Sequence, residues 1–250
     1  MLTSKNAIYL DIQKTGSTFT EAVLQNICNK VYIQKHVPNK ILKPDKLYFT
    51  NIRNPWDYHV SVWTFDVRHN GPLIKRIKHC ELDAKKAKTD FNYFIECLYN
   101  ELNYYDFEDW NPDLQHSLWK NFEGFGLQSF RTCLFFDSSR AIIERDNKES
   151  KDYFKQIYDK PNTHFIEQMD LANQLKSLIE QQISHFGVKE NYQEILNDFI
   201  NKHGGQKWRD KRSFKVSRPD HNYQKYYNDN SQQLIYEKES VIIETFNYKF

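Results

Sequence analysis

The stretch that decides the fold is residues 7–18, which read Ala7-Ile8-Tyr9-Leu10-Asp11-Ile12-Gln13-Lys14-Thr15-Gly16-Ser17-Thr18. Residues 7–12 form an apolar run of strand length, and residues 13–17 are polar with one glycine. A helical pattern begins at Thr18, because apolar residues then recur at steps of three and four: Phe19, Ala22, Val23, Ile27 and Val31. The segment therefore predicts a strand, a tight turn and a helix.

Further strands and helices are expected on both sides of this unit. Apolar runs predict strands at residues 31–33, 47–52, 130–136 and 163–167. Residues 66–125 are expected to be mostly helical, with further helices from Leu171 to about Phe186 and from Leu234 to Phe246. Alternation of strands with helices predicts an α/β fold, in which a parallel sheet has helices on both faces as a three-layer structure. No linker divides the chain, so one domain is expected across residues 1–250.

Composition excludes several classes of protein. The chain has 250 residues, a formal net charge of +2 and 16 % aromatic residues. A chain of this length buries about 70–75 % of its unfolded surface without needing disulfides. No apolar stretch has the length of a membrane helix, which is about 20 residues, and the N-terminus has no apolar signal core. Four widely spaced cysteines are expected to be reduced thiols of a cytoplasmic protein, namely Cys28, Cys80, Cys97 and Cys133.

The first candidate site is the polar turn Lys14-Thr15-Gly16-Ser17-Thr18. The first N–H groups of a helix have no partner within the helix, and the helix dipole is positive at that end. Gly16 permits a tight turn, Lys14 adds a full positive charge, and the hydroxyl groups add donors. These features indicate a site for a phosphate or sulfuryl group, although an ordinary strand–helix turn is the alternative.

The turn lacks the pattern of a nucleoside-triphosphate site. That pattern is GxxxxGK[ST], with the lysine after the last glycine, whereas here Lys14 precedes Gly16. A magnesium–nucleotide site also needs an acidic residue at the end of a neighbouring strand, and residues 47–52 are followed by Arg53. An anion site without a bound metal is therefore expected, and the spacing of His69, His79 and Cys80 fits no set of metal ligands.

The second candidate site begins where the strand at residues 47–52 ends, at Arg53-Asn54-Pro55. Asn54 is suited to cap a helix and Pro55 to occupy its first turn. In open α/β sheets ligands bind at the carboxyl edge of the strands, and the planar guanidinium of Arg53 matches a phosphate. One ligand with two anionic groups is expected to span the two sites. The alternative is a structural arginine paired with Asp57.

Together these segments resemble the sulfotransferases that use 3′-phosphoadenosine 5′-phosphosulfate (PAPS). The family's 5′-phosphosulfate loop reads approximately PKTGT/S, which is similar to residues 13–18. Its 3′-phosphate motif is an arginine, often followed by Asn/Asp-Pro, with a serine eight residues later; Arg53 and Ser61 have this spacing. Residues 165–171, 218–227 and 246–250 resemble the family more weakly, and those last two segments look like bacterial carbohydrate-type members. Residues 66–160 match little and are expected to form a helical insertion on the acceptor side.

The resemblance implies a fold like that of the P-loop nucleotide kinases, with PAPS as donor and adenosine 3′,5′-bisphosphate as product. Lys14 would stabilise charge on the leaving phosphate oxygen. The backbone N–H groups of Thr15, Gly16, Ser17 and Thr18 would bind the 5′-phosphosulfate, and Arg53 and Ser61 would bind the 3′-phosphate. Gln13 stands where the family usually has proline, and Ile166 where cytosolic members often place a tyrosine near the adenine. The adenine contacts are therefore unassigned.

The catalytic base is assigned to His36, in Lys35-His36-Val37-Pro38. Histidine is suited to remove a proton near neutral pH, and a positioned base contributes about 10²–10⁴ in rate. Cytosolic sulfotransferases have a similar Lys-x-His-x-Pro stretch, although one residue is absent here. A solvated loop histidine is the alternative. Glu167 and His59 are the other candidate bases, and His59 is expected to be a packing residue.

Residues 202–218 form a basic segment with seven Lys or Arg side chains and one Asp. A basic flap over the cofactor or over an anionic acceptor is expected here, and a solvated basic loop is the alternative. Because members of the resembled family often close the 3′-phosphate site with a C-terminal loop, the resemblance implies Ser217 or Arg218 as the contact.

Together with this family resemblance, the sequence predicts a cytoplasmic PAPS-dependent sulfotransferase that needs no metal and acts on a hydroxyl group of a small molecule, sugar or glycan. It predicts no specific nucleic-acid partner and leaves the oligomeric state open. Two alternatives remain, a P-loop-like nucleotide or small-molecule kinase and a non-catalytic polyanion-binding domain.

Overall fold

The computed structural model describes residues 1–34, 39, 42–102, 124–136, 147–203 and 222–250. The chain divides into two compact units, each assembled from three segments. The first unit is Met1–Arg53, Leu134–Ser138 and Lys155–Val216, and the second is Asn54–Cys133, Ser139–Phe154 and Ser217–Phe250. Because the segments of the units alternate along the chain, neither unit is a continuous piece of sequence. The single domain expected at residues 1–250 stays a prediction.

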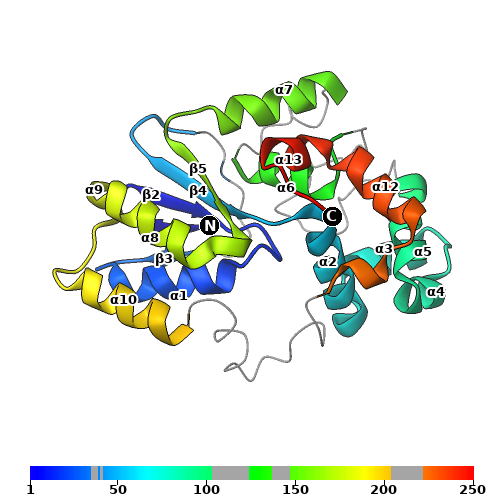
Figure 1. The fold of residues 1–250 in the computed structure, drawn as a ribbon, viewed down its shortest axis with the longest axis horizontal. Coiled ribbons are helices and arrows are strands. Elements are labelled where there is room, and N and C mark those ends of the chain that lie inside the picture. Colours follow the sequence, from blue (N-terminus) through cyan, green and yellow to red (C-terminus); the bar gives the residue numbers. More distant parts are fainter. Residues whose placement is uncertain (35–38, 40–41, 103–123, 137–146, 204–221) are drawn as a thin grey trace. The chain divides into compact units, whose positions relative to one another are not determined.

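A five-stranded sheet forms the centre of the first unit (Figure 1). Its order is β3 (Tyr32–Ile33), β1 (Leu2–Ser4), β2 (Ala7–Leu10), β4 (Leu47–Ile52), β5 (Thr163–Glu167). Strands β2, β4 and β5 are parallel, so their carboxyl ends meet at one edge. The sequence therefore predicted correctly an α/β class and the parallel strands that lead into both candidate sites.

The expectation of a wholly parallel sheet was wrong, because β1 pairs antiparallel with both β2 and β3. Only Lys5 and Asn6 connect β1 to β2, and Lys5 has a left-handed backbone with φ of 48°. Two residues suffice for a hairpin but not for the crossover that parallel strands need. Strand β1 has three residues, which is too short to give a periodic sequence pattern.

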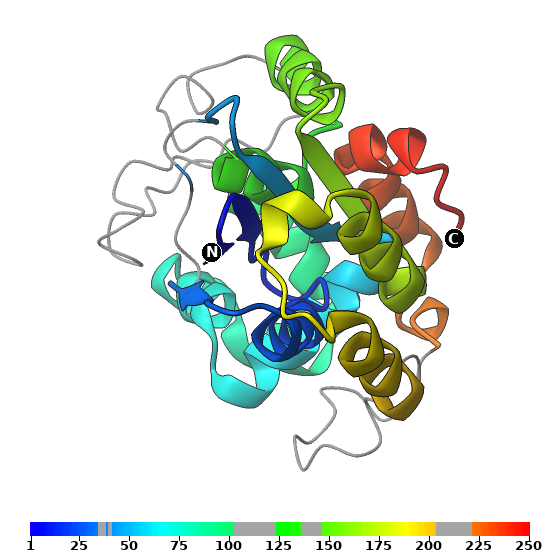
Figure 2. The same cartoon turned by 90° about the vertical axis from the view of Figure 1, so that its left-hand side faces the viewer.

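Four helices of the first unit are α1 (Ser17–Ile27), α8 (Leu171–Gln181), α9 (Ile183–Phe186) and α10 (Tyr192–His203). Figure 2 shows α1 and α10, which contact each other. One hydrophobic core joins α1, α8 and α10 to side chains of the sheet that include Tyr9, Phe49 and Ile166. Since neighbouring side chains of a strand point to opposite faces, Phe165 faces the other side, where its ring contacts those of Phe136 and Tyr158.

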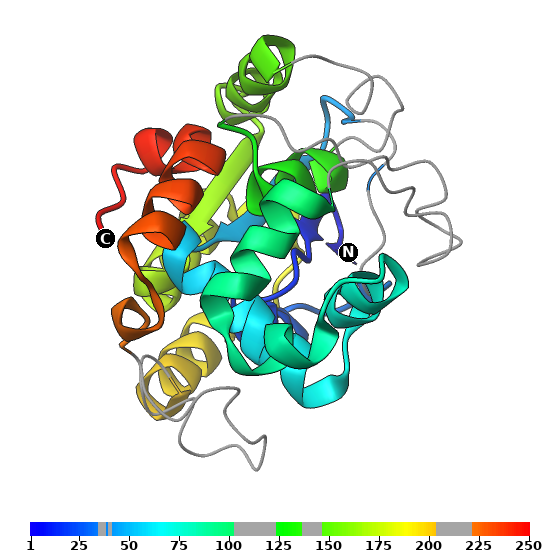
Figure 3. The same cartoon turned by 90° about the vertical axis from the view of Figure 1, so that its right-hand side faces the viewer.

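The second unit is helical in its described part (Figure 3). Its first helices are α2 (Pro55–His69), α3 (Pro72–His79), α4 (Ala84–Thr89) and α5 (Phe91–Glu96), followed by the π-helical turn η1 (Cys97–Glu101). Its last elements are the 3₁₀ turn η6 (Gln224–Tyr226), α12 (Asp229–Lys238) and α13 (Ser240–Thr245). Helices α6 (Leu127–Phe136) and α7 (Asn147–Tyr158) contribute to both units, and the 3₁₀ turn η5 (Gln168–Asp170) precedes α8.

Two expectations about elements were wrong. Residues 130–136 belong to helix α6 and not to a strand. Every residue of this stretch is buried, so no polar face marks its period, and a short apolar run does not distinguish a strand from a buried helix. The helix expected from Leu234 to Phe246 is divided at Glu239 into α12 and α13, for a reason given below.

The start of α2 agrees with its prediction. The side chain of Asn54 accepts hydrogen bonds from the backbone N–H groups of Trp56, at 3.0 Å, and Asp57, at 3.5 Å. Pro55 occupies the first turn, where its missing N–H costs nothing. Strand β4 ends at Ile52, and the Asn54 cap starts α2 at Pro55. No helix in the described ranges combines the length and apolar character needed to cross a bilayer.

Candidate functional site

The turn between β2 and α1 contains two residues in the left-handed backbone region. Lys14 has φ of 70° and Gly16 has φ of 106°. The hydroxyl of Thr15 donates to the carbonyl of Ile12 at 2.8 Å, which closes the turn from inside. Thr15 is fully buried, so its hydroxyl donor serves the turn and is not directed to a ligand.

The N-terminus of α1 is positive and has no side-chain cap. Gly16 is its N-cap residue, and the first turn contains no acidic residue. The N–H of Phe19 donates to the carbonyl of Gly16 at 3.0 Å. Ser17 is half-buried and Thr18 is exposed. Because the first N–H groups and the dipole both favour negative charge, this helix end is suited to hold an anion.

Gly16 is also tightly enclosed. A Cβ atom at this position would lie 3.0 Å from Cδ2 of Leu171 and 3.4 Å from Cγ of Gln168. Both neighbours follow β5, at the next carboxyl end of the sheet. The backbone conformation and the packing therefore each disfavour a side chain at Gly16.

Arg53 connects the two candidate sites that the sequence predicts. Its Nη1 donates to the carbonyl oxygen of Lys14 at 2.9 Å. The residue is 8 % exposed, so the guanidinium is held close to the protein. The structure thus brings the Arg53 side chain against the backbone of the Lys14 turn, at the carboxyl ends of the neighbouring parallel strands β2 and β4.

A polar pair that sequence inspection did not identify lies below this turn. Nδ2 of Asn51 on β4 donates to the hydroxyl of Thr20 on α1 at 2.9 Å, and both residues are fully buried. The pair attaches the first turn of α1 to the strand that ends in Arg53. No local sequence pattern predicts this pair, because the two residues are 31 positions apart and only the fold brings them together.

The second unit contains Ser61, the other residue that the sequence assigns to the 3′-phosphate. Ser61 lies in the second turn of α2 and is 7 % exposed. His36, Ser217 and Arg218 lie outside the described residues, as does most of the basic segment 202–218.

The two other candidate bases differ in their surroundings. Glu167 ends β5 and is half-buried, and its backbone N–H donates to Oε1 of Gln174 at 2.8 Å. His59 is fully buried inside α2, and burial lowers its pKa to about 3. Its ring contacts Tyr99 and the carbonyl of Pro55. This is the environment of a packing residue, as the sequence predicts.

In the part of the chain that the structure describes, no three His, Cys, Asp or Glu side chains form a potential metal site.

Comparison with family models, with curated proteins and with solved structures finds no match for this chain.

Proposed function

We propose that this protein is a PAPS-dependent sulfotransferase that transfers a sulfuryl group to a hydroxyl acceptor, with a sugar or glycan as the acceptor class. The observation that supports it most directly is the contact between Arg53 and the carbonyl of Lys14, beside the uncapped start of α1. Two cationic groups at one sheet edge suit a nucleotide with anionic groups at two positions. The resemblance of residues 13–18 and 53–61 to the family's two nucleotide-binding motifs supports PAPS as that nucleotide.

The turn offers what the 5′ end of such a nucleotide needs. The left-handed Gly16 leaves its backbone without a side chain, and the N–H groups of Thr15 to Thr18 belong to the positive end of α1. Lys14 supplies a full charge at the same turn. The residues present therefore fit a phosphosulfate group, and we assign the 3′-phosphate to Arg53 and Ser61. Ser217 and Arg218 stay assigned to this phosphate by sequence alone.

When bound, PAPS supplies an activated sulfuryl group and leaves as adenosine 3′,5′-bisphosphate. In the proposed mechanism Lys14 stabilises the negative charge that develops on the leaving phosphate oxygen. His36 accepts the proton of the acceptor hydroxyl as its oxygen bonds to sulfur. Catalysis then consists of orientation and electrostatic stabilisation, as in phosphoryl transfer. The fold in this proposal is the P-loop-like sulfotransferase fold, of which the mixed α/β sheet is the coarser description.

Calorimetric titration with adenosine 3′,5′-bisphosphate, AMP and ATP, in the presence of EDTA, tests this function. We expect the bisphosphate to bind more tightly than AMP or ATP. In Arg53→Ala its affinity should fall about 10- to 100-fold, the range for loss of a charge-assisted hydrogen bond of about 1.5–3 kcal/mol. Lys176→Ala is the matched control, because Lys176 is a partly exposed cation on α8 of the same unit.

Three results would contradict the proposal. Tighter, Mg²⁺-dependent binding of ATP would favour a kinase. Steeply salt-dependent binding of polyanions, without discrimination between the bisphosphate and AMP, would favour a polyanion-binding domain. Equal loss of affinity in Lys176→Ala and Arg53→Ala would show that the binding is non-specific.

A further inference from the structure

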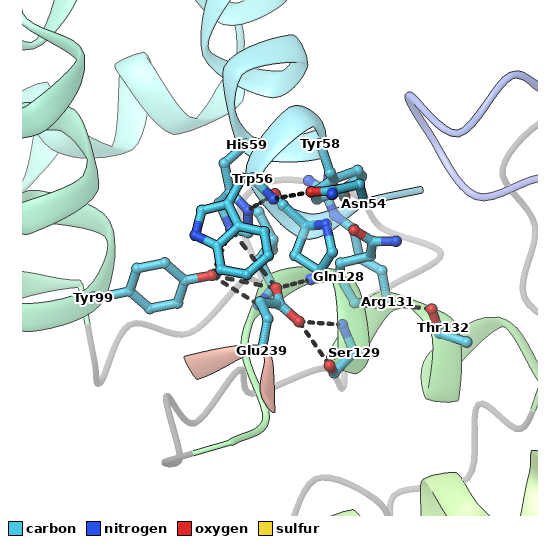
Figure 4. Close-up of polar contacts among 12 residues, drawn as sticks. Asn54, Trp56, Tyr58, His59, Tyr99, Gln128, Ser129, Arg131, Thr132 and Glu239 are labelled. Carbon is cyan, nitrogen blue, oxygen red and sulfur yellow. Dashed lines mark hydrogen bonds and ion pairs between the residues drawn. The ribbon is translucent and has the colours of Figure 1, made fainter. Parts of the chain in front are cut away.

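The second unit contains a chain of buried polar side chains that the proposed reaction does not use. It consists of His59 on α2, Tyr99 on η1 and Glu239 between α12 and α13 (Figure 4). All three are at most 1 % exposed. A buried polar group without a partner is costly, so the hydrogen-bond partners in this chain determine its geometry.

The tautomer of His59 follows from its contacts. Nδ1 lies 2.8 Å from the carbonyl oxygen of Pro55. A carbonyl only accepts, so Nδ1 carries the proton. Because burial lowers the pKa of His59 to about 3, the ring is neutral at physiological pH, and Nε2 has a free lone pair. This nitrogen lies 2.5 Å from the hydroxyl of Tyr99, which therefore donates to it.

Tyr99 and Glu239 extend the chain to α6. The Tyr99 oxygen accepts from the N–H of Leu127 at 3.2 Å. Its hydroxyl also lies 3.4 Å from Oε1 of Glu239, a longer contact than the one to His59. The carboxylate of Glu239 accepts from the N–H of Gln128 at 2.7 Å, and from the N–H and hydroxyl of Ser129 at 3.1 and 2.6 Å. Glu239, which lies between α12 and α13, thus caps the N-terminus of α6. The capped turn in its turn orients Tyr99 through the N–H of Leu127.

The far end of this chain is the first turn of α2. Pro55, whose carbonyl accepts the hydrogen bond from Nδ1–H of His59, occupies the first position of that helix. Trp56 is held on other sides as well: its Nε1 donates to the carbonyl of Gln232 at 3.1 Å, and its carbonyl accepts from the hydroxyl of Tyr227 at 2.8 Å. The first turn of α2 is therefore fixed by contacts from several elements of the second unit.

We propose that Glu239, Tyr99 and His59 are positioning residues, which fix the first turn of α2 and thereby the orientation of Ser61. This inference rests on the proposed function, because it gives α2 the task of presenting Ser61 to the 3′-phosphate. Ser61 follows His59 by two residues, and Arg53 precedes the Asn54 cap directly. Loss of the hydrogen bonds among these three residues should therefore reduce recognition of the 3′-phosphate more than recognition of the rest of the nucleotide.

Tyr99→Phe is the sharpest variant, because it removes one oxygen and leaves Nε2 of His59 and the N–H of Leu127 without their partner. We expect the ratio of affinities for adenosine 3′,5′-bisphosphate and AMP to fall about tenfold, which is the scale of one lost hydrogen bond. Tyr236→Phe is the matched control, because Tyr236 is 44 % exposed on α12, and its ratio should not change.

The tautomer of His59 gives a second readout that needs neither nucleotide nor variant. In ¹⁵N NMR spectra of the unaltered chain we expect a protonated Nδ1 and an unprotonated Nε2 from pH 7 down to pH 5. A protonated Nε2 would overturn the inference, as would an unchanged affinity ratio in Tyr99→Phe while the unaltered chain binds the bisphosphate. If the unaltered protein binds no nucleotide, the proposed function is overturned. The positioning role of Glu239, Tyr99 and His59 is then overturned with it, whichever tautomer His59 has.

Discussion

Lys14 and Gly16 both adopt left-handed backbone conformations, yet only one of them is glycine. A non-glycine residue in this region is strained by about 1–3 kcal/mol, and such strain persists only where the surroundings hold it. The guanidinium of Arg53 and the hydroxyl of Thr15 provide hydrogen bonds to this turn. These two bonds hold the turn in which the proposed function assigns a binding role to the Lys14 side chain.

Exchanging Lys14 for alanine or for glycine separates the two effects. Both variants lose the positive charge, so both should bind adenosine 3′,5′-bisphosphate about tenfold more weakly, as expected for one charged contact. Lys14→Gly should be more stable than Lys14→Ala by about 0.5–1 kcal/mol, because glycine tolerates φ of 70°. Titration and urea unfolding measure the two quantities, and full affinity in either variant would exclude Lys14 from the site.

Gly16→Ala should damage both stability and binding. The new Cβ is strained at φ of 106° and meets Cδ2 of Leu171 at 3.0 Å. We expect a loss of about 1–3 kcal/mol in the free energy of unfolding and loss of nucleotide binding. Gly187→Ala is the control, because Gly187 also has a left-handed backbone and a close Cβ contact, at 3.1 Å from Lys5. Loss of binding in both variants alike would mean that only stability matters.

Sequence inspection identified Lys14, Gly16 and Arg53 because each stands next to a strand end and belongs to a local motif. It did not identify Asn51, since the partner of this side chain is 31 residues away in sequence. Glu239 was missed for the same reason, because it caps a helix from more than 100 residues away.

Hydrogen bonds at the helix ends determine where the helices of the second unit begin and end. The cap at Asn54 is local, so the sequence predicts it. The cap on α6 comes from Glu239, so no residue near position 127 indicates that a helix begins there. The same interaction explains why α12 and α13 are separate helices, because Glu239 adopts a non-helical backbone there as its carboxylate reaches α6. Short range patterns also miss β1, whose three residues pair only through the sheet.

Removing the cap of α2 should destabilise the chain measurably. In Asn54→Ala the N–H groups of Trp56 and Asp57 lose their acceptor, and the carbonyl of Lys249 loses the closer of its two donors, at 2.9 Å. We expect a loss of about 1–2 kcal/mol in the free energy of unfolding. Asn54→Asp keeps the acceptor but not the donor, so a smaller loss should follow. Equal stability of Asn54→Ala and the unaltered chain in urea would refute this role for the cap.

At the scale of the whole molecule, His59 and Glu239 give unfolding an unusual dependence on pH. Burial raises the pKa of Glu239 from 4.5 to about 7, so its contribution to stability is complete below pH 4.5 and is lost as pH rises to 7. Burial lowers the pKa of His59 from 6.5 to about 3, so its contribution is complete above pH 6.5 and is lost as pH falls to 3. Between pH 4.5 and 6.5 the two contributions oppose each other.

The summed contribution of this pair to the free energy of unfolding is therefore flat between pH 4.5 and 6.5. Glu239→Gln lacks the carboxyl titration, so its stability should rise with pH over this range. From pH 4.5 to 7 the unaltered chain should lose about 3 kcal/mol relative to that variant. Chemical denaturation across this range measures the difference, with exposed Glu237→Gln as control. Parallel curves for Glu239→Gln and the unaltered chain would contradict the prediction.

The most direct test of the proposed function is a crystal structure of the chain with adenosine 3′,5′-bisphosphate. We expect the 5′-phosphate against the backbone N–H groups of Thr15 to Thr18 and the side chain of Lys14, and the 3′-phosphate against Arg53. A bound nucleotide with Arg53 turned away from it, or with its phosphates remote from the β2–α1 turn, would contradict the proposal that these two cations hold one molecule.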